Sequence, residues 1–286
     1  MSRSLIACAL EAHATTVVRV KSSEWPPCTV TACRTVAYGI EELQGPKSKK
    51  AISKISKVIG EWADEPLAVS ISPSSILTLP AWFPADASKE QRECLGRIEA
   101  SHFLRNIDEW TWQAMPVDHD SERPEGLEHH LIMFSAVEPA RSIVEMLAQR
   151  FRLCTKGLHF EPLVRLTAGS GDPSAVLELE KDYALFFVSR NGRAEYFRYW
   201  PVKHASEREF FAITELGSSP LEQVSVTGLA ADAATLKRIS AATSRTLEPL
   251  TIPPQVSMAE TRGCQASPGV IKAVSMGMMA LADGCK

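Results

Sequence analysis

Residues 5–20 read LIACALEAHATTVVRV, and residues 175–188 read AVLELEKDYALFFV. Each stretch is an apolar run of strand length, a short polar step and a second apolar run, which is the pattern of a β-hairpin. A third strand is expected after each hairpin, at 29–38 in the first case and at 194–200, behind the turn Asn191-Gly192, in the second. Two such units in one chain indicate a duplicated architecture.

The rest of the chain has regular patterns of its own. A helix with an apolar stripe is expected after Pro46. A β-α-β-β-α-β order follows, in which Ser88 and Gln91 have the spacing of a capping box. The further elements that we expect are strands at 67–71 and 76–79, a helix at 88–104, strands at 110–114 and 131–135, a helix from Pro139 to Phe151, a helix opened by a second capping box at Ser206 and Glu209, a strand at 224–228, and helices at 233–242 and 270–282.

Length and charge exclude several classes of protein. The chain has 286 residues, enough for about two domains, and 31 basic against 34 acidic residues. A dedicated nucleic-acid binder has an excess of basic residues, and this chain has no such excess. No nucleic-acid partner is therefore expected. The apolar run after Met1 is too short for a signal peptide, and no stretch approaches the ~20 apolar residues of a membrane span. We therefore expect a cytoplasmic protein.

The cysteines and histidines give no sign of a metal or catalytic site. The seven cysteines contain no CxxC pair, and such a scattered set predicts reduced, mostly buried thiols. His102 is expected at the edge of a core. Asp118-His119-Asp120 and His129-His130 gather metal-ligand types in one loop, but nothing fixes their geometry, so a solvated strand connection is the favoured interpretation.

The order of elements resembles that of the PilM family, the actin-like proteins of type IV pilus assembly, and more distantly the cytoplasmic domain of the type II secretion protein GspL. The resemblance implies an α/β fold of the duplicated actin-like, ribonuclease H-like type. The stretches that carry it are Leu67–Pro80, Glu93–Leu104 with Ile98-Glu99-Ala100, Phe151–Leu153 with Gly157-Leu158 and Glu161-Pro162, Ala175–Trp200 and Val224–Leu236.

The resemblance also implies domain boundaries. Residues 1–80 with about 161–172 would form the first actin-like lobe, and residues 81–160 an inserted small α+β subdomain. Residues 173–286 would form a reduced second lobe. Only 24 residues, 200–223, separate two of its strands, which leaves room for one helix where the family has a whole subdomain.

The nucleotide-binding motifs of the family are degenerate in this chain. The family has Asp-Ile-Gly in both hairpins, where this sequence has Ala9-Leu10-Glu11 and Glu178-Leu179-Glu180. Glutamate at the glycine positions obstructs and repels phosphate. Thr16 aligns with the family's lysine. Gly228 alone remains of the glycine-rich adenosine motif, where it could equally serve a turn that needs positive φ. No catalytic, cofactor-binding or metal-binding residue is therefore predicted.

The function that the resemblance implies is a non-catalytic cytoplasmic scaffold of a type IV pilus or type II secretion assembly. Its partner would be an inner-membrane protein that contributes a short cytoplasmic segment and recruits the protein to the inner membrane. The aromatic residues Trp82, Phe83, Trp110 and Trp112 favour a docking surface where the inserted subdomain meets the first lobe. The alternatives are an actin-like ATPase that still binds ATP through divergent loops and a polymer-forming actin homologue.

Overall fold

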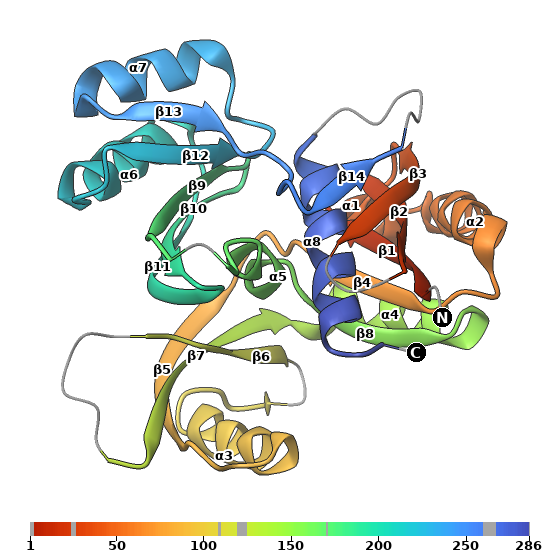
Figure 1. Ribbon diagram of the computed structural model, residues 1–286. Helices are drawn as coiled ribbons and strands as arrows, with labels where there is room; N and C mark the ends of the chain where they lie inside the picture. Colours follow the sequence, from red (N-terminus) through yellow and green to blue (C-terminus); the bar gives the residue numbers. More distant parts are fainter. Residues whose placement is uncertain are drawn as a thin grey trace. The chain divides into compact units, whose positions relative to one another are not determined.

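The computed structural model describes residues 3–23, 27–107, 110–118, 125–169, 171–259 and 267–285. Its elements form two compact units, each assembled from segments that are far apart in the sequence (Figure 1). Unit 1 contains Met1–Pro73, Glu138–Leu166 and Thr251–Lys286, and unit 2 contains Ser74–Val137 and Thr167–Leu250. The main sheet of each unit contains one of the two hairpins.

The sheet of unit 1 has six strands in the order β14-β3-β2-β1-β4-β8. The first three strands along the chain pair in antiparallel fashion, and β1, β4 and β8 then run parallel. The bounds are β1 (Arg3–Leu10), β2 (Thr15–Ser22), β3 (Cys28–Val36), β4 (Leu67–Ile71), β8 (Leu153–Leu158) and β14 (Val256–Met258). The short helices α1 (Ile40–Gln44) and η1 (Gly60–Trp62) lie between β3 and β4 along the chain, and α5 (Phe160–Arg165) follows β8.

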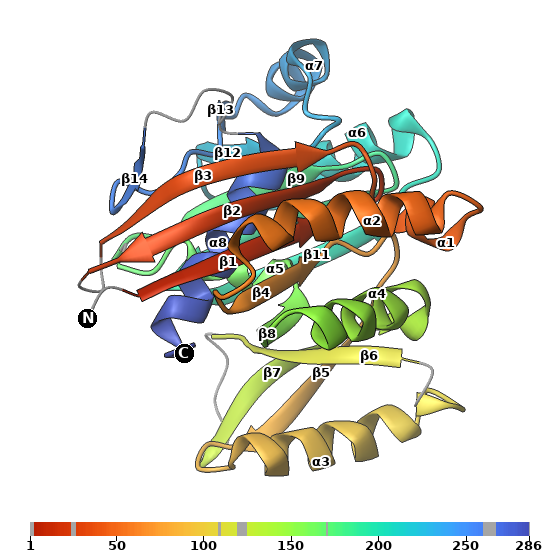
Figure 2. The same ribbon diagram turned by 90° about the vertical axis from the view of Figure 1, so that its right-hand side faces the viewer.

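Both faces of this sheet are covered by helices. Successive side chains of a strand point to opposite faces, so residues 5, 7 and 9 of β1 join one hydrophobic cluster and residues 6, 8 and 10 join another. Helix α8 (Pro268–Ala282) packs in the first cluster, and α2 (Ser48–Ile59) and α4 (Val137–Arg150) pack in the second. Figures 1 and 2 show α8 and α2 on opposite sides of the sheet.

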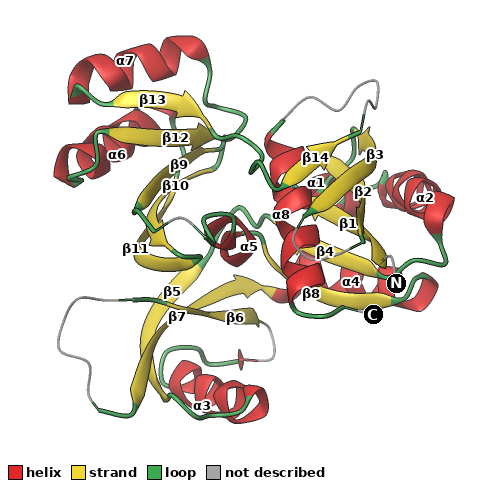
Figure 3. Ribbon diagram, in the orientation of Figure 1, coloured by secondary structure: helices red, strands yellow, loops and turns green. Residues whose placement is uncertain are grey.

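The main sheet of unit 2 repeats this plan, with the order β11-β10-β9-β12-β13. Helices α6 (Ala205–Ser218) and α7 (Ala233–Thr243) pack in one hydrophobic cluster with its strands (Figure 3). The predicted turn at Asn191 and Gly192 is confirmed, since both residues have positive φ, at 51° and 77°. The strand bounds are β9 (Ser174–Leu179), β10 (Tyr183–Arg190), β11 (Arg193–Pro201), β12 (Gln223–Thr227) and β13 (Thr246–Pro249).

A second, three-stranded antiparallel sheet lies in unit 2, with the order β5-β7-β6. Its strands are β5 (Leu77–Pro84), β6 (Trp110–Pro116) and β7 (Leu127–Ala136), and α3 (Lys89–Ser101) packs on one face. The predicted capping box is confirmed, because the Ser88 hydroxyl accepts from the Gln91 N–H at 3.2 Å and the Gln91 side chain accepts from the Ser88 N–H at 2.7 Å.

Two domain assignments made from the sequence differ from the structure. The inserted subdomain was expected to span 81–160, but α4 packs against the sheet of unit 1 and β8 pairs with β4 of that sheet. Residues 251–286 were expected in the second lobe, but β14 pairs with β3 and α8 packs on β1 and β2. Both errors concern pairing between distant segments, which local periodicity does not specify.

The second predicted capping box is displaced by two residues. Helix α6 begins after His204, and the Glu207 carboxylate accepts from the N–H groups of Lys203 and His204 at 2.7 and 3.3 Å. Ser206 and Glu209 therefore lie inside the helix rather than at its start. Glu209 instead accepts a hydrogen bond from Arg238 on α7 at 2.6 Å.

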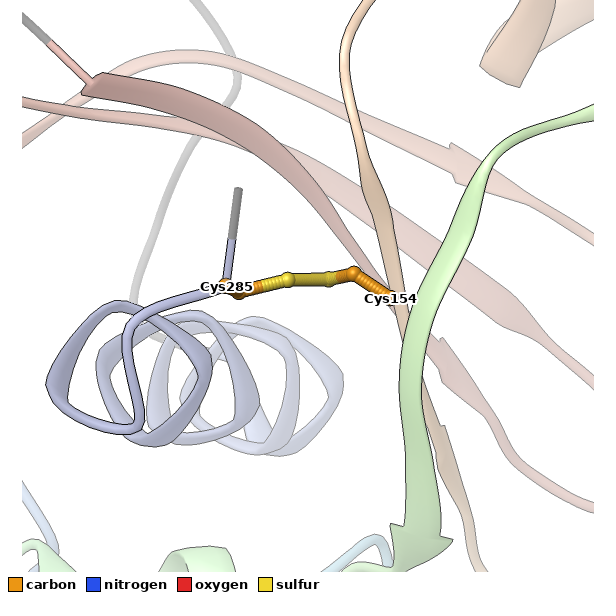
Figure 4. Close-up of a disulfide and its surroundings, with 2 residues drawn as sticks. All are labelled: Cys154 and Cys285. Carbon is orange, nitrogen blue, oxygen red and sulfur yellow. A yellow bond between two sulfur atoms is a disulfide. The ribbon is translucent and has the colours of Figure 1, made fainter.

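The prediction that all cysteines are reduced is wrong at two positions. Cys154 on β8 and Cys285 beyond α8 form a disulfide, with Cα atoms 5.9 Å apart and a sequence separation of 131 (Figure 4). Cys8, Cys28 and Cys33 are buried free thiols as predicted. Burial raises the pKa of the Cys8 thiol to about 12, which keeps it protonated and unreactive. The disulfide ties the end of α8 to the edge of the first sheet.

We predict that replacing Cys154 by Ser lowers the free energy of unfolding by about 2–4 kcal/mol, because the cross-link restricts the unfolded chain. Chemical denaturation without reductant measures this change, and the same change at the exposed free thiol Cys94 is the control. Alkylation of the unfolded protein should label two fewer cysteines without reductant than with it. Equal labelling in the two samples would contradict the pairing.

Candidate functional site

The turn between β1 and β2 is closed by backbone hydrogen bonds. The Glu11 N–H donates to the Ala14 carbonyl at 2.9 Å. The Glu11 and Ala12 carbonyls accept from the N–H groups of Ile40 and Glu41 at 2.9 and 3.0 Å. Gly39 precedes these donors, and a Cβ there would collide with the same two carbonyl oxygens. The polar groups of this turn are thus engaged by the start of α1.

The Glu11 side chain forms a buried ion pair. Its carboxylate lies 3.1 Å from the Lys272 Nζ on α8, and the two side chains are 7% and 1% exposed. A Cβ at Gly269, in the first turn of α8, would collide with the Glu11 carboxylate and the Thr16 hydroxyl. The carboxylate therefore rests against the first turn of a helix, where the helix dipole favours negative charge. Both charges of this pair are compensated within the chain.

The turn between β9 and β10 is closed by the same backbone hydrogen bond as the first. The Glu180 N–H donates to the Tyr183 carbonyl at 2.9 Å. The Glu180 carboxylate accepts from the Leu229 N–H at 3.2 Å, and its carbonyl accepts from Arg208 at 2.9 Å. Glu178 is fully buried and accepts from the Tyr183 hydroxyl at 2.9 Å. Each glutamate of this turn is therefore satisfied by a donor from the chain itself.

Gly228 has the structural role that its sequence context suggested. Its φ is +102°, and a Cβ there would collide with the Leu179 carbonyl. Two residues later the Ala230 N–H donates to that carbonyl at 2.9 Å. Only glycine permits this close approach at positive φ. The turn conformation and the contact with Leu179 therefore explain why glycine is needed here, without an adenosine-binding role.

The described residues of the polar cluster at 118–130 form a structural network. His119 and Asp120 lie outside the described residues. Arg193 pairs with Asp118 at 3.0 Å and with Glu128 at 2.7 Å. His130 is buried and lies 3.1 Å from Glu128, and its burial lowers its pKa. Within the described ranges, no group of three or more His, Cys, Asp or Glu side chains is placed to hold a metal ion.

The remaining predicted residues divide between core and surface. Phe83, Trp110 and Trp112 belong to the hydrophobic cluster under α3. Trp82 is 39% exposed and stacks on His129, with ring centroids 4.7 Å apart. His102 was expected at the edge of a core but is exposed at the end of α3.

Sequence reasoning missed Lys272 as the partner of Glu11. Its only sequence signal was that it is the one charged residue in an otherwise apolar helix, α8. Helical periodicity does not tell which distant residue compensates such a charge.

We predict that Lys272→Met destabilises the protein by about 3–5 kcal/mol, because it leaves the Glu11 carboxylate buried without a compensating charge. Adding Glu11→Gln should recover part of this loss, since the double variant buries no charge. Unfolding by denaturant of both single variants and the double variant gives the coupling energy. Additive effects would show that the two side chains do not interact.

No protein-family model matches the sequence of this chain, and no curated protein matches it. Solved structures do match. A PilM–PilN type IV pilus biogenesis complex superposes with a TM-score of 0.72 at 13% identity, covering 97% of this chain and 98% of the other. A Bacteroides thetaiotaomicron protein with an actin-like ATPase fold gives 0.54 at 9% identity, covering 86% and 90%.

The cytoplasmic domain of EpsL, an inner-membrane component of the Vibrio cholerae type II secretion system, gives a TM-score of 0.49 at 11% identity, covering 98% of this chain and 95% of that domain. The assignment of the fold is based on the two higher scores. The duplicated sheets and these superpositions agree with the fold class expected from the sequence. The chain has the actin-like ATPase fold and resembles PilM over nearly its whole length.

Proposed function

We propose that this protein is a non-catalytic scaffold of a type IV pilus or type II secretion assembly, and that it binds the cytoplasmic segment of an inner-membrane partner. The likeness to PilM supports the assembly, because the solved structure is a complex of PilM with PilN. The observation that carries the non-catalytic part is the buried Glu11–Lys272 pair in the turn of the first hairpin. In the PilM pattern the corresponding turn position is the glycine of Asp-Ile-Gly.

The chemistry of the two turns argues against nucleotide binding. A triphosphate needs free backbone N–H groups and cationic partners. In the first turn, the Lys272 ammonium is already paired with Glu11. In the second, the Leu229 N–H already donates to the Glu180 carboxylate. Phosphate would have to displace a carboxylate from its donor in each turn, and the freed carboxylate would then repel it.

The proposed location follows from the same comparison. No helix within the described residues is long and apolar enough to cross a bilayer. We therefore place the protein in the cytoplasm and assign the membrane attachment to its partner. The partner segment would dock on the β5-β7-β6 sheet and α3, the subdomain that carries Trp82, Trp110 and Trp112.

We predict that ATP with Mg²⁺ at millimolar concentration leaves the Tm unchanged. A ligand present at ten times its Kd would stabilise the protein by about 1.4 kcal/mol, which differential scanning fluorimetry resolves. Sodium triphosphate at equal ionic strength controls for a general anion effect. A Tm increase specific to ATP, with heat of binding in calorimetry, would instead support the ATPase that binds through divergent loops.

We predict that a PilN-type inner-membrane protein of the source organism co-purifies with this chain after co-expression, and that removing the cytoplasmic segment of that partner abolishes recovery. A single docked segment with a few apolar anchors gives micromolar affinity, about −8 kcal/mol. A peptide copy of the segment, titrated by fluorescence anisotropy, measures it. Undiminished recovery of the partner without its segment would contradict the proposed mode of binding.

A further inference from the structure

The edges of the three sheets differ in their protection against pairing with another chain. An edge strand exposes unpaired backbone groups, and proteins usually protect it by shortness, charge, proline or a bulge. Among the described strands there are six edges. β14 has three residues, and β13 has four and ends in Pro249. β8 contains Lys156 and Gly157, and the pairing of β11 with β10 has a register shift.

The β5-β7-β6 sheet has one protected and one unprotected edge. β5 contains Pro80 and Pro84, and Pro80 interrupts its edge in the middle. β6 is seven residues long, contains no charged residue and no glycine, and has proline only at its last position, Pro116. Its pairing with β7 runs from Trp110 to Pro116 without a register shift. Of the six described edges, β6 is therefore the one without a protecting feature over most of its length (Figure 3).

Two hydrogen bonds fix which backbone groups of this sheet point outward. In an antiparallel ladder, residues alternate between pairs that exchange hydrogen bonds and pairs that do not. The Val117 N–H donates to the His129 carbonyl at 2.9 Å, and the Ala85 N–H donates to the Gly126 carbonyl at 3.0 Å. Odd-numbered residues of β5 and β6 therefore face β7, and even-numbered residues direct their backbone groups away from it.

A direct contact supports this direction. Asp118 follows β6 and, like the outward-facing residues of that strand, has an even number. Its N–H points away from β7 and donates to the Ala194 carbonyl of β11 at 2.7 Å. Val117 and Ala194 form one isolated parallel bridge there. This bridge is isolated, and β11 does not pair with the rest of β6. Trp110, Trp112 and Ala114 therefore direct their N–H and C=O groups to an edge that no described strand pairs with.

The side chains along this edge add an apolar component. Trp110, Trp112 and Ala114 are half-buried and pack with the cluster under α3, in which the Trp112 ring lies against Gly96. Alternate side chains of a strand added to β6 would extend this cluster and cover the two indoles. Because Ala194 of β11 pairs with Val117 at one end of β6, a strand added along the rest of β6 has to be short, which suits a single partner segment better than a whole sheet of a second copy.

We propose that β6 accepts an extended segment of the partner as a fourth strand of the β5-β7-β6 sheet. This inference rests on the proposed function and names the chemistry of the partner segment. The segment would carry apolar side chains at alternate positions, facing the cluster under α3, and no proline where its backbone bonds to β6. Recognition would combine main-chain hydrogen bonds to Trp112 and Ala114 with burial of the half-exposed tryptophans.

The test uses a matched pair of proline variants in the full chain. Ala114→Pro removes an outward N–H from the β6 edge, and Thr78→Pro removes an outward N–H from the β5 edge of the same sheet. Neither change removes a hydrogen bond to β7. With the peptide copy of the partner segment, we expect at least about tenfold weaker binding for Ala114→Pro and less than about a twofold change for Thr78→Pro. Thermal unfolding establishes that both variants are folded.

Amide hydrogen exchange of the unmodified protein gives an independent measurement. The Trp112 and Ala114 amides should exchange faster than those of Gln113 and Met115 in the free protein and become protected when the peptide binds. Binding that neither protects these amides nor responds to Ala114→Pro would overturn the inference while leaving the proposed function standing. Protection that appears without peptide, as the protein concentration rises, would identify a second copy as the occupant and also overturn it. If no segment binds the unmodified protein, the proposed function fails and this inference fails with it.

Discussion

The arrangement of unit 1 depends on one buried ion pair, between Glu11 in the first hairpin turn and Lys272 in α8. Helix α8 is buried on nearly all sides, and an apolar helix of this kind could slide along its contact without losing much burial. A single buried charge permits one register only, because any other leaves the charge uncompensated at a cost of several kcal/mol. The pair thus sets the register at the start of the helix, although its members are 261 positions apart in the sequence.

Much of the fold could be predicted from the sequence because local interactions encode it. The apolar alternation of both hairpins, the turn at Asn191 and Gly192, and the capping box of Ser88 each involve residues that are close in the chain. The capping pattern at Ser206 and Glu209 shows the limit of this reasoning. His204 with Glu207 offers the same spacing two residues earlier, and the structure uses that pair.

The long-range pairings could not be predicted, for a common physical reason. The patterns of α4 and α8 show which side of each helix is apolar but not which sheet it covers. The same holds at the turns. The sequence shows glutamates where the PilM pattern has glycines, but it does not show that one meets the ammonium of Lys272 and the other the N–H of Leu229. The disulfide of Cys154 likewise depends on β8 lying beside β4.

The two ends of α8 are anchored in different ways. Glu11 holds Lys272 near the start of the helix, and at its end Cys285 is bonded to Cys154 while Asp283 pairs with Arg165 at 2.8 Å. In an actin-like protein that responds to nucleotide, a bound phosphate and its metal ion would organise the hairpin turn. In this chain the turn is organised by a lysine, which is present at all times and cannot be hydrolysed or released. An internal ion pair thus takes the position that a phosphate and its metal ion would have in a nucleotide-binding relative, which agrees with the non-catalytic role proposed above.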